Sequence, residues 1–229
     1  MFVTALSARR SLVHAVLVVA AFELLAASAL AQQDSLPPGI ADVAPKQARA
    51  APATAKGQPS FDCTNATAPV EKLICGDAGL AALDRTLNDA YTKAMAQWPE
   101  AEKTAQRAAQ RSWIAARNGC AKASEPKPCV ETSYRQRIVA VQITSGALMA
   151  PTPVGLVCKG HENEPFTVAY YNQTDSRAAV VTLGNKQTIA FAAPSASGAR
   201  YTNSEIELWE HQGEVSVKWS GASYTCKAR

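Results

Sequence analysis

The sequence predicts an α+β protein in which a small disulfide-braced helical domain is followed by a small antiparallel β-barrel. Apolar residues recur at helical spacing between Leu80 and Val141, and apolar and polar residues alternate after residue 151. Six cysteines follow a segment that has the features of an export signal. Because a helix repeats every 3.6 residues and a strand every two, the change of period divides the chain into the two predicted domains.

Residues 1–31 are typical of a secretory signal peptide. Arg9 and Arg10 precede a mostly apolar run, which ends in a small-residue pattern that predicts cleavage near Ala31. No later segment approaches the roughly 20 apolar residues that a membrane span needs. The first cysteine, Cys63, lies too far from the cleavage site to carry a lipid anchor. We therefore expect a periplasmic or secreted protein without a membrane anchor.

A linker and then a helical domain are expected after the signal. Residues 32–60 are rich in proline and alanine and hold almost no large apolar side chain, so they cannot form a core. The helical domain is expected over residues 61–145. Its first predicted helix has Asp77 as the N-cap, and Pro99 stops it or starts the next one.

Apolar side chains at helical spacing predict the inward faces of three helices. The two arginines on either side of Trp113, Arg111 and Arg117, are expected on a solvated face. The inward positions are Leu80, Leu83, Leu87, Tyr91, Ala94 and Trp98 in the first helix, Ala105, Ala109, Trp113 and Ala116 in the second, and Val130, Tyr134, Ile138 and Val141 in the third.

Four cysteines are expected to brace this small helical domain, whose helices bury little apolar area. Four cysteines allow three connectivities. We favour Cys63 with Cys75 and Cys120 with Cys129, because each pair flanks a short turn-like segment. A helical hairpin would also bring Cys75 near Cys120, so the sequence leaves the pairing open.

Residues 151–229 have the pattern of a small antiparallel barrel or sandwich. Cys158 and Cys226 stand in its first and last predicted strands, where a disulfide would join the two ends at a gain of about 4 kcal/mol. The alternating runs are Phe166, Val168 and Tyr170, then Ile206 and Leu208, then Val215, Val217 and Trp219, with turns at Gly184-Asn185, Gln212-Gly213 and Ser220-Gly221.

The charge and the histidine content of the chain argue against nucleic acid and zinc as partners. Without the signal the chain keeps 21 basic and 18 acidic residues and has no lysine- or arginine-rich block, so nucleic acid is not an expected partner. A zinc site is disfavoured because there is no CxxC pair and the mature chain has only His161 and His211. No metal or cofactor is expected.

Nearly all of residues 155–227 resembles the MliC/PliC family, bacterial inhibitors of c-type (animal) lysozyme. The matching segments are VCKG around Cys158, SASGARY from Ser195 to Tyr201, LWEHQGEV from Leu208 to Val215, and YTC ending at Cys226. The helical domain resembles the LprI-like domain, also associated with lysozyme inhibition, over about 85 residues. There the matching segments are FDCTNATAPVEKLIC, LAALDRTLNDAY, QRSWIAARNGC and a closing cysteine followed by YRQRI.

The resemblance implies which residues enter the lysozyme cleft. In the MliC/PliC family these are the serine before the glycine of the SGxxY motif and a lysine two residues after the tryptophan of the next strand. The serine here is Ser197, and His211 stands at the position of the lysine. If His211 replaces the lysine, it must be charged in the complex, so inhibition should strengthen as the pH falls through the range where histidine titrates. Lys218 and Arg200 are further cations that can take this role.

The chemistry of lysozyme explains why such a loop is small and polar. Lysozyme uses two carboxylates, one protonated and one ionised, and the hydroxyl of Ser197 can both donate to and accept from such a pair. Small residues let the backbone enter a cleft, and a glycine can take a positive φ. The lysozyme-binding residues that we expect are Ser195, Ser197, Gly198, Arg200, Tyr201 and His211, with Tyr201 either bracing the loop or adding contact area.

The expected function is therefore inhibition of host c-type lysozyme, which would protect the peptidoglycan of the producing cell against host defence. The sequence leaves two alternatives. Ser197 and His211, with Glu210 or Glu214, suggest a hydrolytic triad, but a small barrel has little room for a substrate pocket, so no enzyme is expected. A non-enzymatic module that binds peptidoglycan or another envelope component is the stronger alternative, and His211 and the long spacer favour it.

Overall fold

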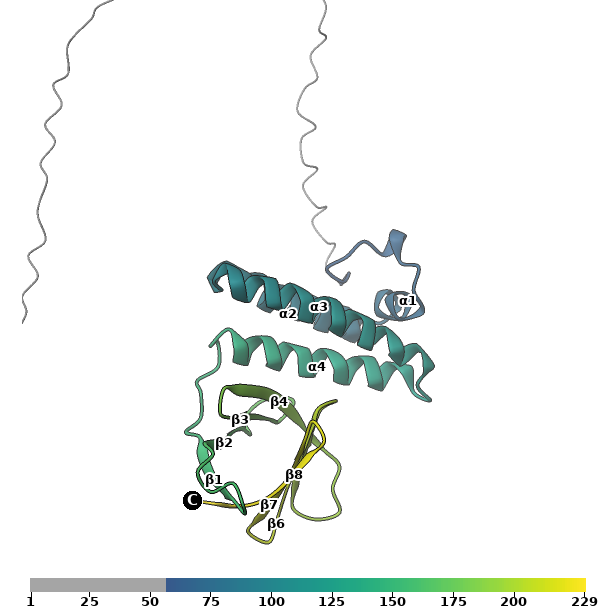
Figure 1. Ribbon diagram of the computed structural model, residues 1–229. Coiled ribbons are helices and arrows are strands. Elements are labelled where there is room, and N and C mark those ends of the chain that lie inside the picture. Colours follow the sequence, from purple (N-terminus) through teal and green to yellow (C-terminus); the bar gives the residue numbers. More distant parts are fainter. Residues whose placement is uncertain (1–56) are drawn as a thin grey trace, which may run out of the picture. The chain divides into compact units, whose positions relative to one another are not determined.

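The computed structural model describes residues 57–229, in which a set of helices is followed by a closed barrel (Figure 1). The predicted signal peptide and most of the predicted linker lie outside the described residues. The helical elements are η1 (Cys63–Asn65), α1 (Pro69–Gly76), α2 (Ala78–Gln97), α3 (Glu100–Asn118), η2 (Gly119–Lys122) and α4 (Pro126–Thr144). The α+β fold class expected from the sequence is confirmed.

Local signals fix where the helices begin. Asp77 caps α2 as predicted, because its Oδ1 accepts a hydrogen bond of 2.9 Å from the backbone N–H of Leu80. Pro99 is the N-cap residue of α3, and Pro126 is the first residue of α4, where its missing N–H is not needed. Helix α1 was not expected from the sequence. The carboxylate of Glu71 accepts from the backbone N–H of Ala68 at its start.

The helices bury one hydrophobic core, in which the four aromatic residues expected there all take part. Trp98 and Tyr134 are buried, and Tyr91 and Trp113 pack against them at the edge. The prediction that Ala105 and Ala116 of α3 face the core is wrong, because both residues are exposed. The buried residues of that helix are instead Gln106 and Arg117.

The burial of Arg117 corrects the expectation that it lies on a solvated face, whereas Arg111 is exposed as expected. The Nη1 atom of Arg117 donates to the Tyr134 hydroxyl over 2.8 Å, and that hydroxyl donates to Asp84 Oδ1 over 2.7 Å. The guanidinium also lies 5.2 Å from the ring centroid of Trp113. Opposite charges bridged by a hydroxyl make burial of the arginine tolerable, because each group keeps hydrogen-bond partners.

Three disulfides occur within the described residues. Cys63 pairs with Cys75 and Cys120 with Cys129, which are the pairings favoured from the sequence. The third disulfide joins Cys158 to Cys226 across the two ends of the barrel.

The barrel contains eight antiparallel strands in chain order, and the last pairs with the first. Its predicted turns at Gln212-Gly213 and Ser220-Gly221 are two-residue hairpin turns in which both residues have positive φ, as type I′ turns require. The strands are β1 (Val154–Cys158), β2 (Phe166–Tyr171), β3 (Ala178–Leu183), β4 (Lys186–Ala193), β5 (Ala199–Thr202), β6 (Ile206–His211), β7 (Glu214–Trp219) and β8 (Ala222–Ala228).

Alternate residues of the strands fill the barrel, as the period of two predicted. Phe166, Val168, Leu208 and Val217 are buried in its core together with the disulfide between β1 and β8. Part of β2 and β3 is buried on the outer face as well, because Ala169, Tyr171, Ala178 and Val180 pack in one cluster with Val139 of α4. The strict alternation of burial is therefore lost in these two strands.

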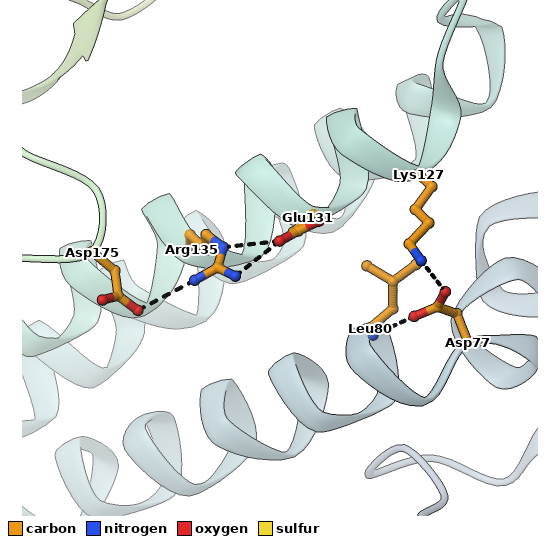
Figure 2. A network of polar contacts seen from close by, with 6 residues as sticks. All are labelled: Asp77, Leu80, Lys127, Glu131, Arg135 and Asp175. Carbon is orange, nitrogen blue, oxygen red and sulfur yellow. Dashed lines mark hydrogen bonds and ion pairs between the residues drawn. The ribbon is translucent and has the colours of Figure 1, made fainter.

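Exposed ion pairs lie along α4 (Figure 2). Lys127 pairs with Asp77 at 2.5 Å and holds the pKa of that carboxyl below its ordinary value. About two turns further along, Arg135 contacts Glu131 on its own helix and Asp175 in the turn after β2. Exposed pairs of this kind contribute little to stability, so the apolar cluster around Val139 is the main contact between α4 and the barrel.

Candidate functional site

The SASGARY segment forms the connection from β4 to β5 and the first part of β5. Residues 195–198 are all exposed, and Ala199 and Arg200 begin β5. Strand β5 pairs with β6 so that Ala199 lies opposite Glu210 and Arg200 opposite Trp209. This register places the loop beside the end of β6, where His211 lies.

Two side-chain donors hold the backbone of the loop. The Ser195 hydroxyl donates to the carbonyl oxygen of Ser197 over 2.6 Å, and the indole Nε1 of Trp209 donates to the same oxygen over 2.9 Å. Within residues 57–229 no hydrogen bond involves the Ser197 hydroxyl itself. The loop is therefore fixed through the carbonyl of Ser197, and its hydroxyl stays available for a partner.

Gly198 is the residue that brings the loop against β6. Its φ of +69° lies in the left-handed region, which glycine adopts without strain. A Cβ at this position would lie 2.0 Å from the carbonyl oxygen of Glu210 and 3.3 Å from the Cα of His211. Only a glycine fits this approach, so Gly198 holds the loop that carries Ser197 against the end of β6, where His211 lies.

Trp209 connects the loop to His211. Both side chains lie on the outer face of β6 because they are two residues apart in a strand. Their rings are stacked, with centroids 5.2 Å apart and planes 11° from parallel. Trp209 keeps 38% of its surface exposed although it is bonded to the loop. Trp209 was not among the site residues expected from the sequence, although its position in the LWEHQGEV segment was a signal for it.

The two other cations proposed for the site share one carboxylate. Arg200 and Lys218 both pair with Glu207, Lys218 at 3.1 Å. Hydrogen bonds from Arg200 first and then from Lys218 lower the pKa of Glu207 below its ordinary value. Both cations are therefore already paired, whereas His211 has no ion pair within the described part of the chain.

Tyr201 points into the barrel. It is 4% exposed, packs against Tyr170 with centroids 5.6 Å apart, and donates from its hydroxyl to Asn172 Oδ1 over 3.1 Å. Burial raises the pKa of Tyr201, and Glu210 acts in the same direction while the cation of Arg177 opposes it. Tyr201 is placed to brace β5 below the loop and contributes no exposed contact area.

Both histidines that follow the predicted signal peptide, His161 and His211, lie within residues 57–229. No three side chains of His, Cys, Asp or Glu in that range converge so that they could hold a metal ion. No hydrogen bond joins Ser197 to His211 there, although Glu214 is the cross-strand neighbour of His211. None of the helices described has the length and apolar character needed to cross a membrane.

Two family models match the chain, one on each side of the change from helices to strands. Residues 63–142 match the model described as lysozyme inhibitor LprI, and residues 157–225 match the model described as membrane-bound lysozyme-inhibitor of c-type lysozyme. The domain order inferred from the two resemblances agrees with these matches.

Curated relatives cover both parts. Lipoprotein LprI of Mycobacterium bovis and of Mycobacterium tuberculosis is 39% identical over 168 residues, which are 73% of this chain and 83% of the relative. The membrane-bound lysozyme inhibitor of C-type lysozyme of Cupriavidus necator is 34% identical over 61 residues, 27% of this chain and 47% of the relative. No solved structure matches the chain. Because the similarity to the mycobacterial proteins extends through the helices into the barrel, the chain belongs to the LprI family.

Proposed function

We propose that this protein is a non-enzymatic inhibitor of host c-type lysozyme, which it blocks by inserting the loop of residues 195–198 into the active-site cleft. The proposal rests on one observation above all. The carbonyl of Ser197 is held by two donors in an exposed loop while its hydroxyl has no partner within residues 57–229. A polar group held in place in this way loses little conformational freedom on binding.

The chemistry of the target fits what the loop offers. Lysozyme needs one protonated and one ionised carboxyl group on either side of the scissile bond. The Ser197 hydroxyl can donate to the ionised group and accept from the protonated one. Ser195, Ala196 and Gly198 add little bulk, so the backbone can follow the hydroxyl into the cleft. The stacked pair of Trp209 and His211 would rest at the rim of the cleft.

His211 supplies the positive charge in this proposal. Its stacking on Trp209 holds the imidazole beside the loop, and an imidazolium would be attracted by the ionised carboxylate of lysozyme. The His211→Ala variant should therefore inhibit lysozyme more weakly than the unaltered protein. Equal inhibition constants for the two proteins would exclude a contribution of His211 to binding.

Long-range electrostatic steering has a small role in this proposal. Residues 151–229 hold seven Lys or Arg and seven Asp or Glu, so the barrel is formally neutral. A c-type lysozyme is usually strongly basic, and a neutral surface attracts it weakly at a distance. Affinity would therefore depend on shape and on a few buried contacts. We place the protein in the periplasm or outside the cell, where it would meet lysozyme before the peptidoglycan is cut.

The decisive experiment is a titration of lysozyme activity on cell walls with the full mature protein and two bulky variants. Ser197→Trp should abolish inhibition because an indole cannot enter the cleft where a hydroxyl did. The control is Ser204→Trp, in the exposed turn between β5 and β6, which should inhibit normally. Inhibition that survives in Ser197→Trp would place the lysozyme contact elsewhere. If the unaltered protein does not inhibit at all, the envelope-binding alternative takes first place.

A further inference from the structure

A second candidate site lies among the helices, where a hollow of about 270 Å³ opens between the segment before α1, helix α2 and helix α3. Aromatic side chains from all three segments line it, namely Phe61, Tyr91 and Trp113. Ile114 stands at its edge with 37% of its surface exposed. The hollow therefore offers apolar faces that water can reach.

The charged groups that line the hollow already have hydrogen-bond partners within the protein. Asp84 is 7% exposed and accepts from the backbone N–H of Ser60 and from the Tyr134 hydroxyl. Arg117 is 6% exposed and donates to the same hydroxyl. The carboxylate of Glu71 is occupied by backbone N–H groups at the start of α1. The lining therefore carries two carboxylates and one guanidinium, and each of them is already hydrogen-bonded within the protein, so none is left to pair with a charged ligand.

Neutral amides supply the hydrogen-bonding capacity that remains. Asn88 is exposed on α2, and within the described part of the chain its side chain makes no hydrogen bond. The Oε1 atom of Gln110 accepts from Arg137 over 2.9 Å, which leaves the amide NH₂ of Gln110 without a partner among residues 57–229. Together they offer donors and an acceptor at the edge of an apolar hollow.

We propose that this hollow binds one ring of a neutral saccharide, such as the terminal sugar of a glycan strand. A sugar ring has C–H faces that pack on aromatic and aliphatic walls, and hydroxyl groups around its edge that pair with amides. The volume is at the small end for ligand pockets, which suits one ring better than a long ligand. The site is separate from the loop of residues 195–198, so the protein could hold the glycan and block lysozyme at the same time.

The test is titration of the full mature protein with oligosaccharides of N-acetylglucosamine and of glucose, followed by two-dimensional NMR of nitrogen-bound protons. Binding should shift the side-chain amide of Asn88 and the indole N–H of Trp113. Asn88→Ala removes one neutral hydrogen bond and should weaken binding about fivefold. The control is Asp89→Ala, whose residue lines a different hollow beside Lys93 and Gln97. Shifts of these signals with both oligosaccharides would support a general saccharide site. Shifts with only one of them would support a site that is selective for that sugar.

Two outcomes would overturn the proposal. One is the absence of shifts with either oligosaccharide at millimolar concentration. The other is shifts that Asn88→Ala leaves unchanged, since the sugar would then bind elsewhere. Lysozyme inhibition is measured in the same samples and should be normal in Asn88→Ala. The two sites are independent if Asn88→Ala loses saccharide binding but inhibits lysozyme fully. They are likewise independent if Ser197→Trp loses inhibition but binds the saccharide normally.

Discussion

Replacing Gly198 with alanine should distort the loop and weaken lysozyme inhibition by about tenfold or more. The new Cβ would lie 2.0 Å from the carbonyl oxygen of Glu210, whereas Cβ contacts under 3.0 Å essentially never occur. The loop and β6 must therefore separate by about 1 Å, and overpacking of this kind costs about 1–3 kcal/mol. The same displacement stretches the bond from Trp209 to Ser197, and a loss of about 1.4 kcal/mol in binding is tenfold in affinity.

The matched control is Gly160→Ala. Gly160 has a similar φ of +77°, but a Cβ there meets nothing within 4 Å. Both variants carry the left-handed backbone penalty of about 1–2 kcal/mol, and only Gly198→Ala adds the steric overlap. Denaturant unfolding measures the free energy of unfolding, and titration of lysozyme activity measures inhibition. Equal unfolding free energies in the two variants, or unchanged inhibition by Gly198→Ala, would refute the reasoning.

Three further variants test single contacts. Trp209→Phe keeps an aromatic ring but removes the donor to Ser197, so inhibition should weaken about fivefold with little change in stability; a titration that matches wild type would show that the indole does not hold the loop. Tyr134→Phe removes the hydroxyl that links buried Arg117 to buried Asp84, which keeps only the backbone N–H of Ser60, so the free energy of unfolding should fall by about 2–4 kcal/mol, measured by denaturant unfolding. The pKa of Glu207 is lower in the folded protein than in the unfolded chain. The ionised side chain therefore stabilises the fold at pH values above the ordinary glutamate pKa, and this stabilisation is lost as the pH falls through the lowered pKa. The midpoint temperature of thermal unfolding should therefore change less between about pH 6 and pH 3 in Glu207→Gln than in the unaltered protein.

The barrel could be predicted from the sequence because its signals are local. Val215, Val217 and Trp219 alternate with polar residues, and Ser220-Gly221 is a dipeptide that suits a two-residue hairpin turn. Because successive side chains of a strand point to opposite faces, the apolar residues of each alternating run are the ones that face the core. The cystine between Cys158 and the last strand then closes the ends.

The parts that could not be predicted depend on partners that are distant in sequence. Burial of Arg117 is tolerable only because Tyr134 and Asp84 meet it, and the latter two are 50 positions apart. The role of Trp209 depends on the strand register that brings its indole to the carbonyl of Ser197. Helix α1 has only eight residues, too few for a clear apolar period.

The closure of the barrel also bears on how the chain folds. Strand β8 follows the other seven strands in the chain, yet it pairs with both β7 and β1. Until β8 is in place, β1 and β7 each present unpaired backbone groups, which are templates for association with other chains. A folding molecule is therefore most exposed to association before β8 pairs. The oxidation that joins Cys226 to Cys158 would then make this last pairing irreversible under oxidising conditions.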